Sequence, residues 1–178
     1  KLKLNHSDEI IRLLGDEILD IGFVYHRPKQ LKFDVSLFLK DEIILVTSYQ
    51  NNFNIEDEVN SRDLLKLPLL YVDLGPVFFK WLVEQLGDRP LLRLSVDHIS
   101  SVVDYVKDGL GCGFVPRSTV EKELAGKELK IIKIKDVKPP ERKIYMLINK
   151  GKKDSLALRK WIKMIKSFKK GKTNGQIK

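Results

Sequence analysis

The most constraining feature of this chain is a short stretch that contains an amphipathic helix, a glycine turn and a buried strand in direct succession. It runs from Ser95 to Pro116 with the sequence SVDHISSVVDYVKDGLGCGFVP. Asp97 is a favoured N-cap residue, and Gly109 and Gly111 provide a stop. Between them apolar residues recur at helical spacing on one face: Ile99, Val102, Val103, Val106 and Leu110. The run from Cys112 is apolar enough for a strand buried in an α/β sheet, and Pro116 closes it.

The same alternation of strand and helix continues on both sides of this stretch. Leu69–Asp73 and Leu91–Val96 have the composition of strands, and Pro76–Leu86 is an amphipathic helix with proline in its first turn and Gly87 at its end. A further helix is expected from Arg117 to Ala125. This order predicts an α/β fold with mostly parallel sheets flanked by helices.

Two breaks divide the chain into lobes. The first is the polar run from Ser48 to Asn60, and the second is Lys138 followed by Pro139 and Pro140. We expect a discontinuous lobe I, formed by residues 1–47 and 141–178, and an inserted lobe II, formed by residues 48–140. The elements expected in lobe I are a helix capped by Ser7 and ended by Gly15, the strands Lys1–Leu4, Ile18–Tyr25, Phe33–Phe38, Glu42–Thr47 and Lys143–Ile148, and a helix over Asp154–Phe168 with Leu158, Trp161, Ile162, Ile165 and Phe168 inward.

These motifs resemble those of the effector-binding domain of LysR-type transcriptional regulators. A helix, a G-L-G turn, a short apolar strand and a proline follow one another here at Ile99–Pro116, and the family's L-D-x-G pattern stands at Leu19–Gly22. The resemblance implies a periplasmic-binding-protein-like fold of type 2. It also implies that a small metabolite binds between the lobes and controls DNA binding by an N-terminal winged helix-turn-helix; Tyr25, His26 and Arg27 suggest that this metabolite is an anion.

The resemblance further implies which parts of such a regulator lie outside this chain. The sequence enters at the second strand, so the first strand and helix of lobe I and the DNA-binding domain are expected to be missing, and DNA is expected to be a partner only through that domain. Because the family pairs its subunits through a strand and helix of each lobe, we expect a homo-oligomer with Lys1–Leu4 and Leu91–Val96 as candidate interface strands.

The charge and hydropathy of the chain limit its partners. The net charge is +9, but residues 155–178 hold eight lysines and arginines and no acid, so the other residues carry only +1. We interpret the basic tail as a solvated helix face and frayed end rather than a nucleic-acid surface. No long apolar run and no secretory leader is visible, which predicts a cytoplasmic protein without a membrane partner. The single cysteine fits a reducing compartment.

Four groups of residues follow expected strands or begin expected helices, where open α/β sheets bind ligands. In the first group a phenol, an imidazole and a guanidinium could meet a carboxylate, although a polar strand end explains them equally well. In the second, a glycine allows close backbone approach and the following helix offers its positive end, although a plain loop between strand and helix explains these residues equally well. In the third, His98 and Ser101 could hydrogen-bond a ligand, although Asp97 is more often simply an N-cap and a histidine in the first turn of a helix is more often solvated. The fourth group is implied by the resemblance alone. The candidate effector-binding residues are Tyr25, His26 and Arg27; Leu74, Gly75 and Pro76; Asp97, His98 and Ser101; and Val115 and Pro116 with Thr47 and Ser48.

Several other functions are disfavoured. The glycines around Cys112 follow a helix and precede a strand, the reverse of the order in dinucleotide-binding motifs, and we expect Cys112 to be a buried thiol rather than a nucleophile. The three histidines lack metal-ligand spacing, so no metal, cofactor or catalytic set is predicted. A stand-alone solute-binding protein and, less favoured, an enzyme on the same fold remain as alternatives.

Overall fold

The computed structural model of the chain describes residues 2–29, 32–50, 53–87, 92–152 and 155–174. It divides into two compact units, unit 1 formed by Lys1–Lys40 and Lys143–Lys178, and unit 2 formed by Asp41–Arg142. The expected boundaries were 47/48 and 140/141. The first differs because strand β3 (Ile43–Ser48), expected in lobe I, pairs with strands β7 (Cys112–Pro116) and β8 (Leu129–Ile134) of unit 2.

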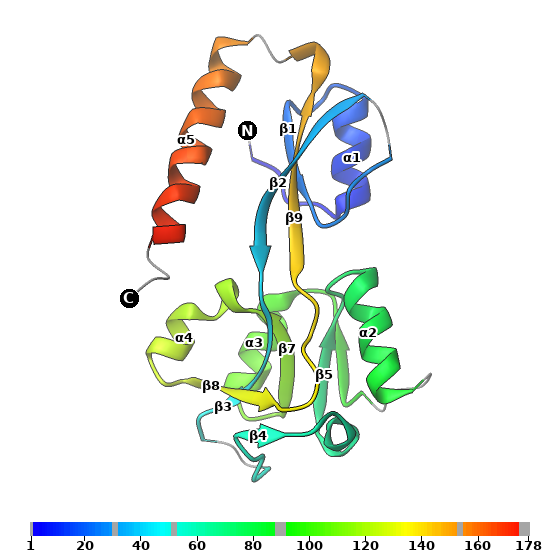
Figure 1. The fold of residues 1–178 in the computed structure, drawn as a ribbon, viewed down its shortest axis with the longest axis vertical. Helices are drawn as coiled ribbons and strands as arrows, with labels where there is room; N and C mark the ends of the chain where they lie inside the picture. The colour runs from blue at the N-terminus through cyan, green and yellow to red at the C-terminus, as the bar shows by residue number, and fades with distance from the viewer. Residues whose placement is uncertain (1, 30–31, 51–52, 88–91, 153–154, 175–178) are drawn as a thin grey trace. The chain divides into compact units, whose positions relative to one another are not determined.

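Unit 1 contains a three-stranded sheet with helices packed against it (Figure 1). Its strand order is β1-β9-β2, and β1 runs antiparallel to β9 with Gly22 opposite Leu147. The β1–β9 pair is thus an antiparallel exception within the expected, mostly parallel fold. The elements of this sheet and its flanks are α1 (Ser7–Gly15), β1 (Ile21–Val24), β2 (Phe33–Asp41), β9 (Arg142–Asn149), the 3-10 turn η3 (Lys150–Lys152) and α5 (Leu156–Asn174).

The two helices of unit 1 cover opposite faces of this sheet, because successive strand residues point to opposite sides. Val24 and Leu147 are fully buried beside the α1 residues Ile11 and Leu14. On the other face, Met146 and Ile148 are buried beside the α5 residues Leu158 and Ile165, with Phe23 and Phe38 packed against them. The ring centroids of Phe23 and Phe38 lie 4.8 Å apart.

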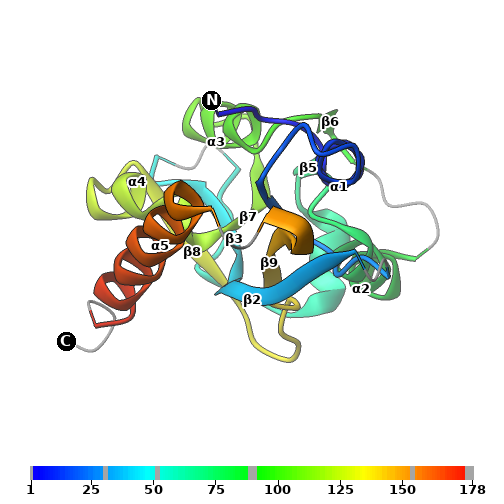
Figure 2. The ribbon, with the colours of Figure 1, turned by 90° about the horizontal axis from the view of Figure 1, so that it is seen from above.

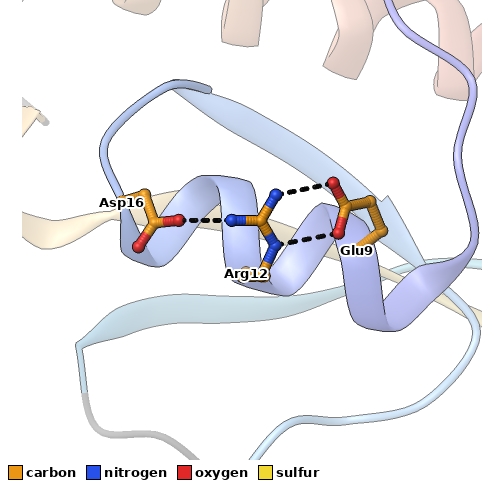
Figure 3. Close-up of polar contacts among 3 residues, drawn as sticks. All are labelled: Glu9, Arg12 and Asp16. Carbon is orange, nitrogen blue, oxygen red and sulfur yellow. Dashed lines mark hydrogen bonds and ion pairs between the residues drawn. The ribbon is translucent and has the colours of Figure 1, made fainter.

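Helix α1 carries its charges on its exposed side. The Arg12 guanidinium donates to Glu9 at 2.8 and 2.9 Å and to Asp16 at 2.9 Å, so it joins two turns of the helix (Figure 3). The hydrogen bond from Arg12 holds the pKa of the Glu9 carboxyl below its usual value. The expected N-cap was Ser7, but the cap position is His6; the Ser7 hydroxyl instead accepts a hydrogen bond from the Tyr25 amide at 3.1 Å. This bond ties the end of β1 to the start of α1.

Two further expectations for unit 1 are wrong. Lys1–Leu4 was expected to be a strand, but residues 2–6 have no regular structure, and Leu2 and Leu4 are 83% and 90% exposed because no described strand pairs with them. Trp161 was expected to point inward, but 52% of it is exposed, whereas Leu158 and Ile165 are buried. Lys1, Asp154 and the Phe168 side chain lie outside the described residues.

Unit 2 is built on a six-stranded sheet with the order β4-β8-β3-β7-β5-β6 (Figure 1). The pairs β4–β8, β5–β6 and β5–β7 are parallel, and β3 runs antiparallel to both of its neighbours. Parallel pairs thus predominate here, as expected, around one reversed strand. The elements not yet bounded are β4 (Glu58–Val59), η1 (Ser61–Lys66), β5 (Leu69–Val72), α2 (Pro76–Leu86), β6 (Leu94–Val96), α3 (Ile99–Lys107), η2 (Arg117–Thr119) and α4 (Glu121–Ala125).

Helices α2 and α3 pack on opposite faces of this sheet, with β5 and β7 between them (Figure 2). A Cβ atom on Gly113 would lie 2.6 Å from Val102 of α3, so only glycine allows that helix to come so close. The next residue, Phe114, points the other way and meets Phe78 and Trp81 of α2 at ring-centroid distances of 5.3 and 5.5 Å. These contacts fix where both helices begin relative to the sheet.

Helix α2 matches the expected bounds, and the other expectations for unit 2 need three corrections. The N-cap of α3 is His98, one residue beyond the expected Asp97. The helix expected over Arg117–Ala125 is divided into η2 and α4. Strand β8 was not predicted, because lysines interrupt the apolar residues of its sequence LKIIKI. Leu91, the expected start of a strand, lies outside the described residues, and that strand begins at Leu94.

Candidate functional site

The carboxyl ends of three neighbouring strands meet at one edge of the six-stranded sheet in unit 2. Strands β5, β6 and β7 are parallel neighbours, with Val72 opposite Val96 and Leu70 opposite Gly113. Parallel strands end on the same side, so this edge gathers the segments that follow each of them. Three of the four predicted groups therefore lie together: Leu74, Gly75 and Pro76 after β5, Asp97, His98 and Ser101 after β6, and Val115 and Pro116 at the end of β7.

The start of α2 is open to the solvent at this edge. Gly75 has a φ of 102°, a conformation that favours glycine, and a Cβ added there would meet nothing within 4 Å. The Gly75 amide donates to the Asp73 carboxylate at 2.8 Å, which holds the turn, and Pro76 occupies the first helical turn. Among the described residues no side chain caps α2, so its first N–H groups keep their partial positive charge for a ligand.

The start of α3 is likewise open to the solvent and without a side-chain cap among the described residues. Its N-cap, His98, is exposed, and no described side chain caps the helix. Ser101 is half-buried and its amide donates to the His98 carbonyl at 3.2 Å, so the serine lies in the first turn of the helix. Two uncapped helix starts thus follow two adjacent parallel strands, an arrangement that suits an anion.

A hydrogen-bonded corner that was not predicted lies next to the end of β7. The Asp41 carboxylate, 8% exposed, accepts hydrogen bonds from the Ser118 hydroxyl at 2.5 Å and the Ser118 amide at 3.3 Å. The Arg117 amide donates to the Glu42 carbonyl at 2.8 Å, and the two side chains form an ion pair at 3.4 Å. These bonds join the start of β3 to the segment after Pro116. Only the register of β3 against β7 brings them together, and no local pattern in the sequence signals that register.

Thr47 and Ser48 lie at the opposite edge of the sheet. Because β3 is antiparallel to β7, Thr47 is paired with Cys112, at the beginning of β7 rather than its end. Both hydroxyls are buried and bonded to backbone: Thr47 donates to the Gly111 carbonyl at 3.2 Å and Ser48 to the Lys107 carbonyl at 3.3 Å. They hold the C-terminal turn of α3, and the structure does not bring them to the other candidate residues of unit 2.

Tyr25, His26 and Arg27 belong to unit 1 and follow β1. Arg27 is exposed, and His26 lies 3.3 Å from the Asp8 carboxylate of α1. Tyr25 is 46% exposed and lines an apolar cavity of about 440 Å³ between the sheet and α5. The other residues that line this cavity are Phe23, Phe38, Ile144, Trp161, Met164 and Ile165. Sequence reasoning missed the cavity because its lining comes from both ends of the chain.

The thiol, metal sites and membrane spans considered in the sequence can also be compared with the structure. Cys112 is buried, as predicted, and burial raises the pKa of its thiol to about 12. Within the described ranges no group of three or more histidine, cysteine, aspartate or glutamate residues could hold a metal ion. None of the described helices is both long enough and apolar enough to cross a membrane.

Comparison with known families defines the class to which this fold and sheet edge belong. Residues 1–169 match the LysR substrate binding domain. The chain belongs to this family, which confirms the resemblance predicted from the G-L-G and L-D-x-G motifs and the predicted role as the effector-binding domain of a LysR-type regulator. It is 27% identical over 143 residues to the HTH-type transcriptional regulator CitR of Bacillus subtilis (strain 168), an alignment that covers 79% of this chain and 49% of CitR. The chain thus spans about half the length of that relative.

Solved structures confirm the type 2 periplasmic-binding-protein-like fold. The effector binding domain of QuiR in complex with shikimate has a TM-score of 0.72 at 18% identity, over 94% of this chain and 79% of that one. The regulatory domain of CcmR from Synechocystis PCC6803 in complex with 2-PG has a TM-score of 0.76 at 17% identity, over 96% and 83% of the two chains.

Proposed function

We propose that this domain senses a small organic anion and that the anion binds where α2 and α3 begin. The observation that carries the proposal is the pair of uncapped helix starts at the ends of the adjacent strands β5 and β6. Free N–H groups at a helix start favour negative charge, and two of them on one edge can hold one carboxylate or phosphate. The QuiR and CcmR domains, which share the fold, were solved with shikimate and 2-PG.

The proposed contacts in unit 2 divide by chemistry. The amides that follow Gly75 and His98 hold the anionic group, and the Ser101 hydroxyl and His98 imidazole add hydrogen bonds. Asp97 is negatively charged, so we assign it to hydroxyl groups of the effector. Leu74, Pro76, Val115 and Pro116 supply apolar contact. Thr47 and Ser48 are left out because their hydroxyls serve the turn after α3.

The contribution of unit 1 rests on the family resemblance rather than on geometry. Tyr25, His26 and Arg27 are proposed as further contacts, with Arg27 as the cation that completes charge neutralisation. In this proposal the effector binds one arrangement of a larger regulator more tightly than another. The output is DNA binding by an N-terminal domain of that regulator, in the cytoplasm, and no catalytic step is assigned to the chain.

Self-association is part of the same proposal. Strand β6 is an edge strand that pairs only with β5 among the described strands, and Leu94 is 38% exposed there. An unpaired edge of this kind can dock a second copy. Sedimentation equilibrium of the chain should show a dimer, and a monomer at high concentration would contradict this part of the proposal.

A thermal-shift screen with small carboxylates and phosphate esters tests the proposed site. Saturation at 100 times Kd stabilises a protein by about 2.7 kcal/mol, which is a shift of roughly 5–10 °C for a chain of this size. His98→Ala and Ser101→Ala should each raise the apparent Kd obtained from the thermal shift at least fivefold. His6→Ala, which removes an exposed imidazole at the start of α1, is the matched control and should leave it unchanged. Equal weakening by His6→Ala would refute the site.

A further inference from the structure

Helix α5 is rich in basic residues and contains no acidic residue. Its residues, Leu156–Asn174, include one arginine and six lysines and no acid. This differs from α1, which contains Asp8 and Glu9 as well as Arg12. A helix with this composition either remains solvated or meets a polyanion.

The basic residues and the packed residues of α5 occupy different sides. Leu158 and Ile165 are buried against the sheet of unit 1, and Ile162 packs beside them. Trp161 and Met164 line the apolar cavity with Phe23 and Phe38. Arg159, Lys160 and Lys163 are exposed. In the sequence Lys166 and Lys170 continue from Lys163 at three- and four-residue spacing, which places them on one helical stripe.

Several lysines of unit 2 lie beside carboxylates. In unit 2, Lys107 lies 2.6 Å from Glu128, Lys133 lies 2.9 Å from Glu58, and Lys130 lies 2.5 Å from Asp57. Residues 155–178 carry +8 of the net +9, so nearly all of the net positive charge of the sequence lies in this segment.

In place of the solvated face that we inferred from the sequence, we propose that the exposed basic face of α5 binds the phosphate backbone of duplex DNA without reading its sequence. The duplex offers one negative charge per about 1.7 Å of its axis, and a row of lysines on a helix gains affinity by releasing the condensed counterions. An anionic bilayer is the weaker partner, because an interfacial helix must bury its apolar side in lipid. In α5 that side packs on the sheet and lines the cavity.

This surface shares no residue with the proposed effector contacts. It lies on unit 1, and the uncapped helix starts that carry the effector proposal lie on unit 2. A regulator that contained this domain would gain a second, salt-sensitive contact with DNA in addition to sequence recognition by another domain. The inference does not depend on which effector binds, or on whether one binds.

Fluorescence anisotropy of a labelled random-sequence 20-base-pair duplex tests the proposal with the full 178-residue chain. Binding should appear at about 50 mM salt and weaken steeply as salt rises. Lys160→Glu with Lys163→Glu should weaken it at least tenfold and lower the slope of log K against log salt by about 2. The matched control is Lys122→Glu with Lys127→Glu, which reverses two exposed charges near α4 and should change affinity less than threefold.

Three results would overturn the proposal. The first is absence of DNA binding by the unmodified chain at 50 mM salt. The second is equal weakening by the two double variants, which would indicate net charge rather than a surface. The third is binding to phosphatidylserine vesicles with no binding to DNA. Thermal denaturation of both variants, expected within 3 °C of the unmodified chain, ensures that a loss of binding is not a loss of fold.

Discussion

The Asp41 carboxylate accepts two hydrogen bonds from Ser118, one from the hydroxyl at 2.5 Å and one from the amide at 3.3 Å. The two residues are far apart in the sequence, and they meet because β3 is antiparallel to β7, with Ile43 opposite Pro116. Asp41 is buried, and Ser118 follows the strand end that belongs to the candidate effector site. The bond pair therefore supports one side of that site.

Asp41→Ala is expected to lower the free energy of unfolding by about 2 kcal/mol, because a buried charged acceptor is removed and the Ser118 donors lose their partner. Urea denaturation measures the effect. Ser118→Ala should remove much of the same energy, so the double variant should cost clearly less than the two single variants together. Strict additivity would mean that the two residues stabilise the fold independently. Glu121→Ala, an exposed carboxylate on α4, should change the free energy by less than 0.5 kcal/mol.

Gly111→Ala is expected to destabilise the domain by more than about 3 kcal/mol. Gly111 has a φ of 154°, and an added Cβ would lie 2.1 Å from the Pro68 carbonyl oxygen, a backbone atom that cannot easily move. Gly87→Ala is the comparison, since Gly87 has a φ of 79° and open space around it, and its cost should be only about 1 kcal/mol. Similar midpoints in urea for the two variants would show that the clash at Gly111 is relieved cheaply.

The Cys112 thiol should be unreactive in the folded protein. Burial raises its pKa from 9.0 to about 12, so the nucleophilic thiolate is scarce at pH 8. Modification by 5,5′-dithiobis(2-nitrobenzoate) should be slow in buffer and rapid in urea. The raised pKa also destabilises the folded state as pH rises above 9, because there the unfolded chain ionises and the folded chain does not. Rapid labelling without denaturant would contradict this burial.

Acid should weaken the link between Ser61 and Asp136. Hydrogen bonds from the Ser61 hydroxyl at 2.7 Å and amide at 2.8 Å lower the pKa of the Asp136 carboxyl. A lowered pKa contributes stability above the unfolded value of 3.8, and that stability is lost as pH falls through the folded value. Asp136→Asn should therefore make the free energy of unfolding less dependent on pH below about 4. An unchanged acid profile would mean that this carboxyl is not coupled to folding.

Local signals in the sequence predicted the helices and buried strands well. Pro76 at the first turn and Gly87 just past the last one mark both ends of α2, and the apolar run at Cys112 marks β7. Long-range pairing was harder to predict. The alternation of Lys1–Leu4 suggests a strand, but a strand also needs a partner, and the described residues provide none.

For the candidate site, too, the order of elements was predictable from the sequence and the long-range strand pairing was not. The order of elements alone implies that groups which follow parallel strands share one edge of the sheet, and the groups after β5, β6 and β7 lie there. Thr47 and Ser48 were misplaced because the direction of β3 reverses them to the far edge, and periodicity carries no information about strand direction. The Asp41–Ser118 pair was missed for the same reason.

The most direct test of the central claim is a two-dimensional amide NMR titration of the chain with whichever carboxylate or phosphate ester stabilises it. We predict that the largest shift changes fall on Gly75, Val77 and Phe78 and on His98–Ser101, with saturation at one ligand per chain. Changes confined to the α5 residues around Trp161, with none at the two helix starts, would contradict the account.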